Sequence, residues 1–371
     1  MVLRDPEAPS WPRQSGTDRR GMIVQTLPQP LPWNALEEPL RCVGVRAETA
    51  DVRTFTFRPP PGRWCAYRPG QFVTVELPTA EGPVLRSYTL SSSPSRPFSV
   101  SITAKLKAGS VATQWMFDNL APGFGLKFTQ PMGNFHLPDP LVGPLLLISA
   151  GSGATPCMSM LRWVADCAPG LKVTYVHAAR SADDILFRRE LELLAGQMPG
   201  LRLLFILGRE AEGESLIAGR LDAELLRRLV PERLERQVYC CGPQGFMEAM
   251  QAALLADGLA TEAWHQESFG PASGGLLLPE APAVSEGAVV RFARSGVEVP
   301  VGAGQTILQM AQAAGIAAPF ACGMGVCGTC KVRARGSVEM HHQGGIFEDE
   351  VEDGFILACC SRPLASVEVD L

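Results

Sequence analysis

Three cysteines near the C-terminus have a spacing that suits a metal centre. They occur as Cys322-Gly-Met-Gly-Val-Cys327-Gly-Thr-Cys330, and the pair Cys359-Cys360 follows about thirty positions later. A C-x4-C-x2-C loop with a distant fourth cysteine is typical of a [2Fe-2S] cluster, because small glycines let the backbone approach the sulfurs. A structural zinc site is the alternative, although zinc more often takes two C-x2-C pairs or mixed cysteine and histidine ligands.

The tetrapeptide Arg86-Ser87-Tyr88-Thr89, at the end of an expected strand, suits a flavin. A flavin needs a cation for its pyrophosphate, an aromatic face for its ring system and a hydroxyl near N5. Arginine and tyrosine on one strand also occur as ordinary surface residues. A second anion site is expected at the helix start Gly109-Ser110-Val111-Ala-Thr113, where Ser110 or Thr113 caps the helix; capping alone is the simpler interpretation.

A glycine loop, Gly151-Ser-Gly153-Ala-Thr155-Pro156, follows an expected strand and opens a helix, the context in which such loops bind phosphate. Proline replaces the third glycine of the usual pattern, but proline suits a first helical turn. Cys241-Gly242-Pro243 is expected at the same sheet edge, or Cys240 and Cys241 are simply small buried residues. Arg180-Ser181 stands either beside a nucleotide ribose or at a surface turn.

The histidines offer no competing metal site. They lack the Cys-x-His pairs of a Rieske cluster and the spacing of a mononuclear iron site. The chain is therefore expected to pass electrons on and not to activate oxygen. The acidic run from Glu348 to Asp353 is most simply a solvated helix face, or else a surface that steers a basic partner.

The elements that must position these groups fall into three regions. Short runs separated by proline and glycine turns predict a small antiparallel barrel, with strands at Arg41–Val45, Val52–Phe57 and Gln71–Leu77. Strands then alternate with helices, which predicts a parallel sheet whose ligand lies at the strand C-terminal ends. Its strands are expected at Leu145–Ala150, Lys172–His177, Leu201–Leu207 and Gln237–Cys241, and its helices from Met158 and over Ile185–Leu194, Leu221–Leu229 and Gly245–Leu255. The last region combines a hairpin from Val289, a helix over Thr306–Ala314 and the cysteine loop.

The chain is accordingly divided into five parts. The expected limits are a flexible arm at 1–37, the barrel at 38–139, the α/β domain at 140–269, a linker at 270–286 and a small α+β domain at 287–371.

Composition restricts the class of protein. The chain has 371 residues, of which 46% are hydrophobic and 19% charged, which is typical of globular proteins. No apolar stretch is long enough for a membrane span, and the first residues lack the pattern of a secretory signal. Eleven cysteines are then expected as reduced thiols and cluster ligands in the cytoplasm. A net charge of -5 argues against nonspecific binding of nucleic acid.

The three motifs and their order resemble the ferredoxin-NADP reductase superfamily, and specifically the single-chain reductases that serve Rieske-type oxygenases. The resemblance covers about residues 40 to 371. Cys322–Val332, Gly344-Gly-Ile346 and Gly354–Ser361 are similar to the reductases of oxygenases that act on glycine betaine. Met158–Trp163 and Ile217–Leu221 are also similar to the NADH reductase of the hybrid-cluster protein. The resemblance implies a flavin barrel, a nicotinamide domain and a β-grasp ferredoxin domain.

The resemblance also implies roles for residues of this chain. Thr89, Cys241 and Glu267 are the implied catalytic residues, with Phe269 helping to close the flavin face. Flavin adenine dinucleotide (FAD) is implied to be bound by Arg86, Ser87, Tyr88, Thr89, Gly109, Ser110, Val111 and Thr113. The nicotinamide dinucleotide is implied at Gly151, Gly153, Thr155, Pro156, Arg180, Ser181, Cys241, Gly242 and Pro243. The implied cluster ligands are Cys322, Cys327, Cys330 and Cys359, because the family's fourth cysteine is followed by three residues and a proline, as in Cys359–Pro363; Cys360 is the rival.

The function implied is electron transfer from NADH through FAD and a [2Fe-2S] cluster to a separate Rieske-type oxygenase. That oxygenase is expected to demethylate glycine betaine or a similar quaternary ammonium compound. The alternatives are the NADH reductase of the hybrid-cluster protein and, in a different class, an electron carrier without catalysis. NADPH remains a possible donor, since Arg180 could contact a 2′-phosphate and no acidic ribose ligand is evident after His177.

Overall fold

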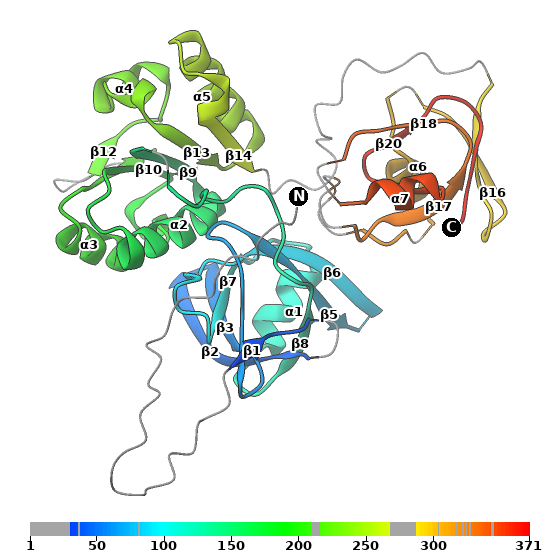
Figure 1. The fold of residues 1–371 in the computed structure, drawn as a ribbon, viewed down its shortest axis with the longest axis horizontal. Coiled ribbons are helices and arrows are strands. Elements are labelled where there is room, and N and C mark those ends of the chain that lie inside the picture. The colour runs from blue at the N-terminus through cyan, green and yellow to red at the C-terminus, as the bar shows by residue number, and fades with distance from the viewer. Residues whose placement is uncertain are drawn as a thin grey trace, which may run out of the picture.

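The computed structural model of the chain forms three bodies, each with its own apolar core (Figure 1). It describes residues 30–35, 38–80, 82–141, 143–208, 216–267, 287–302, 304–316, 318–320, 323, 325, 328–342 and 345–371. Cys322, Cys327, Phe269 and Gly344, together with most of the predicted N-terminal arm and the predicted linker, lie outside these residues.

The first body is a six-stranded antiparallel barrel with the strand order β6-β5-β8-β2-β3-β7. A bridge between Leu90 and Ile102 joins the end of β6 to β7 and closes the sheet. Residues such as Phe55, Phe57 and Val75 alternate along their strands and fill the interior. The bounds are β2 Leu40–Thr49, β3 Val52–Arg58, β5 Phe72–Thr79, β6 Gly82–Thr89, β7 Val100–Lys105, β8 Gly125–Phe128 and helix α1 Val111–Asn119, with a short pair β1 Leu31–Pro32 and β4 Arg63–Trp64.

The second body is a six-stranded parallel sheet with the order β12-β11-β10-β9-β13-β14. Helices α2 and α3 cover the face nearer the barrel, and α4 and α5 cover the other face (Figure 1). The sheet bounds are β9 Leu145–Ala150, β10 Val173–Ala179, β11 Leu201–Leu207, β12 Leu216–Ala218, β13 Gln237–Cys241 and β14 Trp264–Glu267. The helices are α2 Ala154–Cys167, α3 Arg188–Gln197, α4 Ala223–Leu229 and α5 Gln244–Ala256.

The second body differs from its sequence-based prediction at three helix starts and two strands. The predicted helix from Met158 begins earlier, at Ala154, directly after the turn Gly151–Gly153. The predicted helix from Ile185 begins only at Arg188, because Phe187 takes a left-handed backbone conformation with φ 57°. The predicted helix from Leu221 begins at Ala223, because the Asp222 side chain accepts a hydrogen bond from the Leu225 N–H at 2.8 Å and caps it. Strands β12 and β14 were not predicted; both are short, and β14 is mostly polar in sequence.

The third body is a mixed sheet with the order β16-β15-β21-β17-β19, packed against helix α6. Thr306 and Gln309 form a capping box at the start of α6. The bounds are β15 Val289–Phe292, β16 Val297–Pro300, α6 Ile307–Ala313, β17 Lys331–Arg335, β18 Val338–Met340, α7 Glu348–Glu352, β19 Phe355–Leu357, β20 Ser361–Pro363 and β21 Val367–Val369. In the described part of the chain, none of the helices has the length and apolar composition that a membrane crossing requires.

Candidate functional site

The carboxyl edge of the parallel sheet meets the barrel, and the predicted catalytic residues lie at this junction. Cys241 and Glu267 are opposite each other in the register of β13 and β14. On the barrel side, Thr89 ends β6 opposite Phe72. Gly133 joins the two sides, because a β-carbon there would lie 2.9 Å from the Phe72 ring and 3.8 Å from Glu267 Oε1. The structure therefore brings Thr89, Cys241 and Glu267 to one place.

Two buried polar atoms at this junction have no hydrogen-bond partner among the described residues. They are Thr89 Oγ1 and Glu267 Oε2. An unsatisfied buried polar group is costly, so native structures pair such groups with protein, water or a ligand. A ring system with polar edge atoms, such as a flavin, would supply the missing partners, so the residues present fit that cofactor.

Burial sets the charge of these groups. It raises the pKa of the Glu267 carboxyl to about 8, so the group is mostly protonated at neutral pH. Burial also raises the pKa of the Cys241 thiol well above its usual value, with the nearby Glu267 adding to the effect. The site therefore offers a neutral carboxylic acid, a neutral thiol and a hydroxyl, and it does not contain a thiolate nucleophile.

The glycine loop lies between β9 and α2 and is packed against β13. Residues Gly151–Gly153 form a 3-10 turn, and Pro156 falls in the first turn of α2, where its missing N–H costs no helical hydrogen bond. A β-carbon at Gly153 would lie 2.0 Å from the carbonyl oxygen of Cys241, so only glycine fits there. The Thr155 hydroxyl donates to the Ser152 carbonyl at 3.1 Å. The loop and Cys241 are thus fixed against each other.

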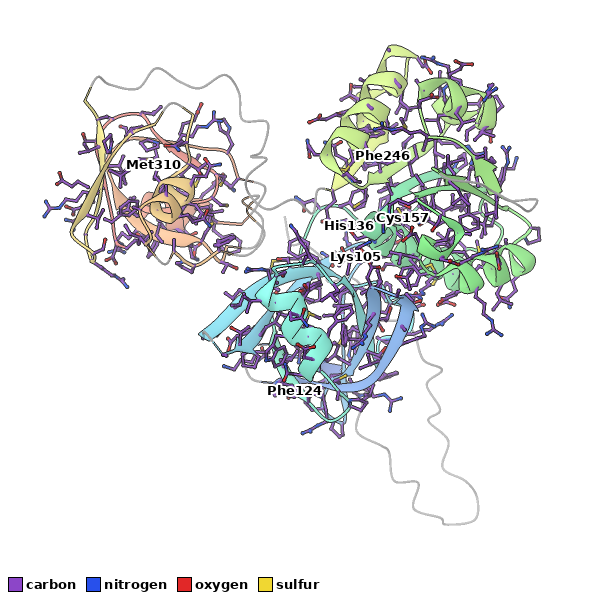
Figure 2. All side chains as sticks on the ribbon, turned by 180° about the vertical axis from the view of Figure 1, so that it is seen from behind. Lys105, Phe124, His136, Cys157, Phe246 and Met310 are labelled. Atoms are coloured by element: carbon purple, nitrogen blue, oxygen red, sulfur yellow. The ribbon has the colours of Figure 1, made fainter. Side chains whose placement is uncertain are left out.

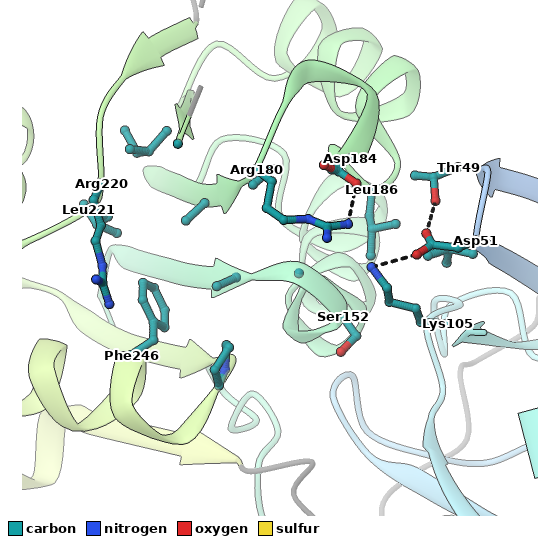
Figure 3. A pocket seen from close by; sticks show the side chains of 18 of the residues that line it. Thr49, Asp51, Lys105, Ser152, Arg180, Asp184, Leu186, Arg220, Leu221 and Phe246 are labelled. Carbon is teal, nitrogen blue, oxygen red and sulfur yellow. Dashed lines mark hydrogen bonds and ion pairs between the residues drawn. The ribbon is translucent and has the colours of Figure 1, made fainter. Parts of the chain in front are cut away.

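A cavity of about 890 Å³ opens above this loop. Its lining comes from both bodies, since Asp51 and Lys105 belong to the barrel whereas Arg180, Arg220 and Phe246 belong to the α/β body (Figure 3). Lys105 lies where the two bodies meet, whereas Cys157 is buried between α2 and β9 within the α/β body (Figure 2). Three cations beside a glycine loop, with an aromatic ring at one wall, suit a dinucleotide.

Two ion pairs face each other at the mouth of this cavity (Figure 3). Arg180 Nη2 lies 3.0 Å from Asp184 Oδ1, and Lys105 Nζ lies 3.0 Å from Asp51 Oδ2. Burial opposes ionisation of Asp184, but hydrogen bonds from Ser181 and Arg180 outweigh it and lower the pKa of the carboxyl. Arg180 and Ser181 thus border the cavity through Asp184, an acidic group that the sequence prediction lacked.

The remaining predicted flavin residues lie along the barrel. Arg86 is exposed, and its Nη1 donates to the neighbouring Leu85 carbonyl at 2.8 Å. Ser87 Oγ lies 3.0 Å from Thr74 Oγ1, and burial raises the pKa of the partly buried Tyr88 to about 12. Of the two predicted caps of α1, Ser110 is the N-cap, because it accepts from the Thr113 N–H at 3.4 Å. The Thr113 hydroxyl instead accepts from the Lys107 N–H at 3.1 Å, and Gly109 takes φ 74° ahead of the cap.

In the described part of the cysteine loop, the backbone lies close to the sulfurs of Cys359 and Cys360. The Gly325 N–H donates to Cys359 Sγ at 3.3 Å, and the Cys359 side chain is also hydrogen-bonded to those of Cys330 and Cys360. Gly325 and Gly328 both take φ 69°, and a β-carbon at Gly325 would lie 2.8 Å from Cys360 Sγ. Cys360 Sγ itself donates to the Leu357 carbonyl at 3.7 Å. A backbone that directs an N–H at a cysteine sulfur fits a metal cluster held by thiolates.

Sequence reasoning missed several residues of the nucleotide cavity. Lys105 ends β7 of the barrel and Asp51 lies in the turn between β2 and β3, so only the packing of two bodies brings them there. Arg220 belongs to the segment Ile217–Leu221 that resembles a reductase, but its place beside the cavity follows only from β12 and the packing of the sheet.

Three family models match successive parts of the chain. The oxidoreductase FAD-binding domain matches residues 40–137, the oxidoreductase NAD-binding domain matches residues 147–252, and the 2Fe-2S iron-sulfur cluster binding domain matches residues 290–364. The three models coincide with the three bodies of the fold and occur in the predicted order.

Relatives match nearly the whole chain. The stachydrine N-demethylase reductase subunit of Rhizobium meliloti is 41% identical over 339 residues, which is 90% of this chain and 96% of the relative. A glycine betaine monooxygenase reductase subunit of Pseudomonas aeruginosa is 40% identical over 346 residues, 89% and 94% of the two chains. Phthalate dioxygenase reductase has the same fold, with a TM-score of 0.55 and 22% identity over 90% of this chain and 97% of that one.

Proposed function

This chain belongs to the single-chain oxygenase reductases that join an FAD-binding, an NAD-binding and a [2Fe-2S] domain, and on that premise we propose its electron path and partner. It is an oxidoreductase. The path runs from NADH through FAD and the cluster to a separate Rieske-type oxygenase that demethylates a quaternary ammonium compound.

One observation carries the first half of the path. Thr89 Oγ1 and Glu267 Oε2 are buried without partners at the junction of the barrel and the α/β body, beside Cys241. A reacting pair that meets there is removed from water and lies between a hydroxyl and a neutral carboxylic acid. Such a pocket supports direct transfer of hydride between a nicotinamide and a flavin.

The residues have separate tasks in this proposal. FAD, when bound, supplies the conversion of a two-electron donor into single electrons. Thr89 and the protonated Glu267 offer hydrogen bonds to the polar edges of the rings. Cys241 and Gly242 would contact the nicotinamide, and the loop Gly151–Pro156 would bind the pyrophosphate. Arg86, Ser87, Tyr88 and the segment Gly109–Thr113 hold FAD, with Phe269 as a further flavin contact.

The second half of the path uses the cysteines. We assign the cluster to Cys322, Cys327, Cys330 and Cys359. The Gly325 N–H, which is directed at Cys359 Sγ, favours Cys359 as the fourth ligand, whereas Cys360 Sγ donates to a backbone carbonyl. A [2Fe-2S] cluster held by these thiolates would supply transfer of single electrons.

NADH is the proposed donor. Asp184, near Arg180 and Ser181, is placed to accept hydrogen bonds from the adenosine ribose, as an acidic residue does in NAD-binding domains. Arg180 is held by that carboxylate and is therefore less free to bind a 2′-phosphate. Comparing kcat/KM for NADH and NADPH tests this, and a preference for NADPH would contradict it.

The oxygenase partner is proposed to meet helix α7. Phe347, at the start of α7, is 73% exposed, and Val351 on the same helix is also exposed. Acidic side chains surround them at Glu348, Asp349 and Glu352. The Gly345 N–H donates to the Gly325 carbonyl at 3.0 Å, which ties this segment to the cysteine loop. An aromatic anchor with an acidic rim beside the electron exit suits a partner with a basic docking face.

The substrate of the partner is inferred from the relatives. The two named above serve enzymes that act on stachydrine and glycine betaine, both quaternary ammonium compounds. The cytoplasm is the proposed location, on the basis of the many expected free thiols.

A two-step experiment tests the proposal. In the first step, NADH added without oxygen should bleach the flavin and then the cluster of the purified protein. In the second step, the protein plus the oxygenase component should release formaldehyde from glycine betaine or stachydrine. Failure to bleach the flavin rejects the catalytic role, and reduction without demethylation of either compound rejects the proposed partner.

A further inference from the structure

We propose that Arg162 and Ser159, both on helix α2, are positioning residues for hydride transfer. They fasten the barrel segment that follows Thr89 to the helix whose N-terminus forms the nucleotide loop. The inference rests on the proposed transfer from NADH to FAD and adds to it the device that sets the geometry of that transfer.

Arg162 joins three elements from a buried position. It is 9% exposed, and its Nη1 donates to the carbonyl of Ser91 at 2.5 Å. Its Nε and Nη2 donate to the two carboxylate oxygens of Glu190 on α3, each at 2.7 Å. The guanidinium also lies over the Phe187 ring, 5.0 Å from its centroid. Charge-assisted, two-pronged bonds of this kind fix an orientation as well as a distance.

The Ser159 hydroxyl makes two hydrogen bonds to the barrel backbone. It donates to the Ser92 carbonyl at 2.7 Å and accepts from the Gly70 N–H at 3.3 Å, and the side chain is fully buried. Gly70 lies just before Phe72 in sequence, and Ser92 lies just after Thr89. Because Phe72 and Thr89 are opposite each other in β5 and β6, one hydroxyl holds both strands beside the pair.

The segment after Thr89 is held equally firmly from its other side. The Ser91 N–H donates to the Ser101 carbonyl at 2.8 Å, and Ser91 Oγ lies 2.9 Å from Thr103 Oγ1 on β7. The Ser101 N–H donates to Ser92 Oγ at 2.9 Å. The backbone at 91–92 is thus hydrogen-bonded to β7 on one side and to α2 on the other. A displacement of α2 would therefore also displace Thr89.

The nucleotide loop, Gly151–Pro156, lies at the N-terminus of α2. Gly153, at the helix N-terminus, packs against the Cys241 carbonyl, and Ser159 lies less than two turns further along the same helix. A single rigid helix therefore relates the nucleotide loop and Cys241 to Thr89. Hydride transfer needs the reacting atoms about 3–3.5 Å apart, and a misplacement of about 1 Å can cost about 100-fold in rate.

The exposed ion pairs between the two bodies restrain the alignment less. Arg96 pairs with Asp166 at 2.6 Å, and Arg46 lies 3.8 Å from Glu190, but both arginines are mostly exposed. Exposed ion pairs are screened by solvent and restrain geometry weakly. Among the polar contacts between the two bodies in the described residues, the buried hydrogen bonds of Arg162 and Ser159 are therefore the best suited to fix the orientation, whereas the buried contact of Phe135 with Tyr239 is apolar and less directional.

The test compares Arg162→Ala, Arg162→Lys and Ser159→Ala with the wild-type holoprotein in anaerobic stopped-flow reduction by NADH. We expect the limiting rate of flavin reduction to fall at least ~10-fold in Arg162→Ala. The apparent Kd for NADH should stay within ~2-fold, because the loop itself is intact. Lysine can donate to fewer of these partners than arginine, so the limiting rate of Arg162→Lys should lie between those of wild type and Arg162→Ala. The primary deuterium isotope effect should rise as hydride transfer becomes slower than the other steps.

Controls separate alignment from folding. Arg188→Ala removes an exposed arginine on α3 that pairs with Glu192, and it should leave the limiting rate unchanged. FAD content and the rate of flavin reduction by dithionite should match the wild type in every variant. If Arg162→Ala does not fold, Ser159→Ala and Arg162→Lys decide the question with the same measurements.

Two results overturn the inference. One is a limiting rate within ~2-fold of wild type in the folded Arg162 and Ser159 variants. The other is a slower rate explained wholly by lost FAD or weaker NADH binding. If the wild-type protein itself is not reduced by NADH, the proposed function fails instead, so the two failures are distinguishable.

Discussion

The carbonyl oxygen of Cys241 lies so close to Gly153 that a β-carbon on residue 153 would stand only 2.0 Å from it. This contact presses the nucleotide loop onto the end of β13. The loop can therefore keep its shape only while residue 153 has no side chain.

Replacing Gly153 by alanine should push the loop away from β13 and raise the Kd for NADH at least ~10-fold, since the pyrophosphate loses its cradle. Isothermal titration with the oxidised holoprotein measures this. Gly196→Ala is the matched control, because that glycine lies within α3 with open space around it, and the change should stabilise the protein by ~1 kcal/mol. Equal NADH affinities in Gly153→Ala and wild type would refute the steric argument.

The protonation of Glu267 predicts a pH dependence. Its pKa is about 8, raised by burial, so the carboxyl is neutral below that pH and becomes a buried charge above it. The rate of flavin reduction by NADH should therefore fall as pH rises through about 8. The contribution of this group to the free energy of unfolding is full below about pH 4.5 and is lost as pH rises to about 8, because the folded pKa is the higher one.

Glu267→Gln keeps a neutral hydrogen-bond donor and should remove that pH dependence while retaining activity near pH 7. Stopped-flow rates at closely spaced pH values measure it. Glu192→Gln, which alters an exposed carboxylate on α3, should keep the wild-type profile. An unchanged inflection in Glu267→Gln would assign the titration to another group.

The fourth cluster ligand can be separated from its neighbour. Cys359→Ser should lose the cluster, measured as iron content and as the electron paramagnetic resonance signal of the reduced protein. Cys360→Ser should retain both, because Cys360 Sγ contacts the Leu357 carbonyl. The reverse result would make Cys360 the ligand.

His177 should make the α/β body sensitive to acid. The side chain is fully buried, with Nδ1 2.8 Å from Ser149 Oγ, and Nε2 has no partner among the described residues. Burial lowers its pKa from 6.5 to about 4. As pH falls, the unfolded chain is protonated first, so stability is full above about 6.5 and is lost towards pH 4, by up to ~3 kcal/mol.

His177→Phe removes the titrating group and should abolish this part of the acid sensitivity. The difference in free energy of unfolding, variant minus wild type, should be ~2–3 kcal/mol larger at pH 4.5 than at pH 7. Urea unfolding at the two pH values measures this difference, whatever the variant loses in absolute stability. A constant difference between the proteins would exclude His177 as the source.

Phe347→Ala should slow electron transfer to the oxygenase without changing reduction of the flavin by NADH. The loss should be ~10-fold or more if Phe347 is an anchor of the interface. Raising the ionic strength should weaken the wild-type reaction, because the surrounding rim is acidic. Leu193→Ala, which removes another exposed apolar side chain, on α3, should have no effect. Oxygenase reduction at the wild-type rate in Phe347→Ala would place the docking face elsewhere.

The sequence allowed much of the fold to be predicted where the signal is local. The apolar run Leu145–Ala150 is buried on both faces of the sheet, and such runs stand out in a sequence. The order of FAD, NAD and [2Fe-2S] domains followed from three separate motifs, and the family models confirm it.

Long-range contacts could not be predicted in the same way. Lys105 reaches the nucleotide cavity only because the barrel packs against the α/β body. Arg162 reads in the sequence as an ordinary helical arginine, and its partners Ser91 and Glu190 lie far away along the chain. Strand β14, Trp264–Glu267, has too few apolar residues to be predicted from the sequence pattern. It forms by pairing with β13.

The fastening of α2 to the barrel bears on how such reductases can be recombined. The junction near residue 140 is a boundary in sequence, yet the buried bonds of Ser159 and Arg162 cross it. A chimera joined there would pair a foreign barrel with a helix whose partners differ. The portion from Leu40 to Glu267 should therefore be exchanged as one piece. The third body, which begins with β15 at Val289, is the part to exchange when a new electron acceptor is wanted.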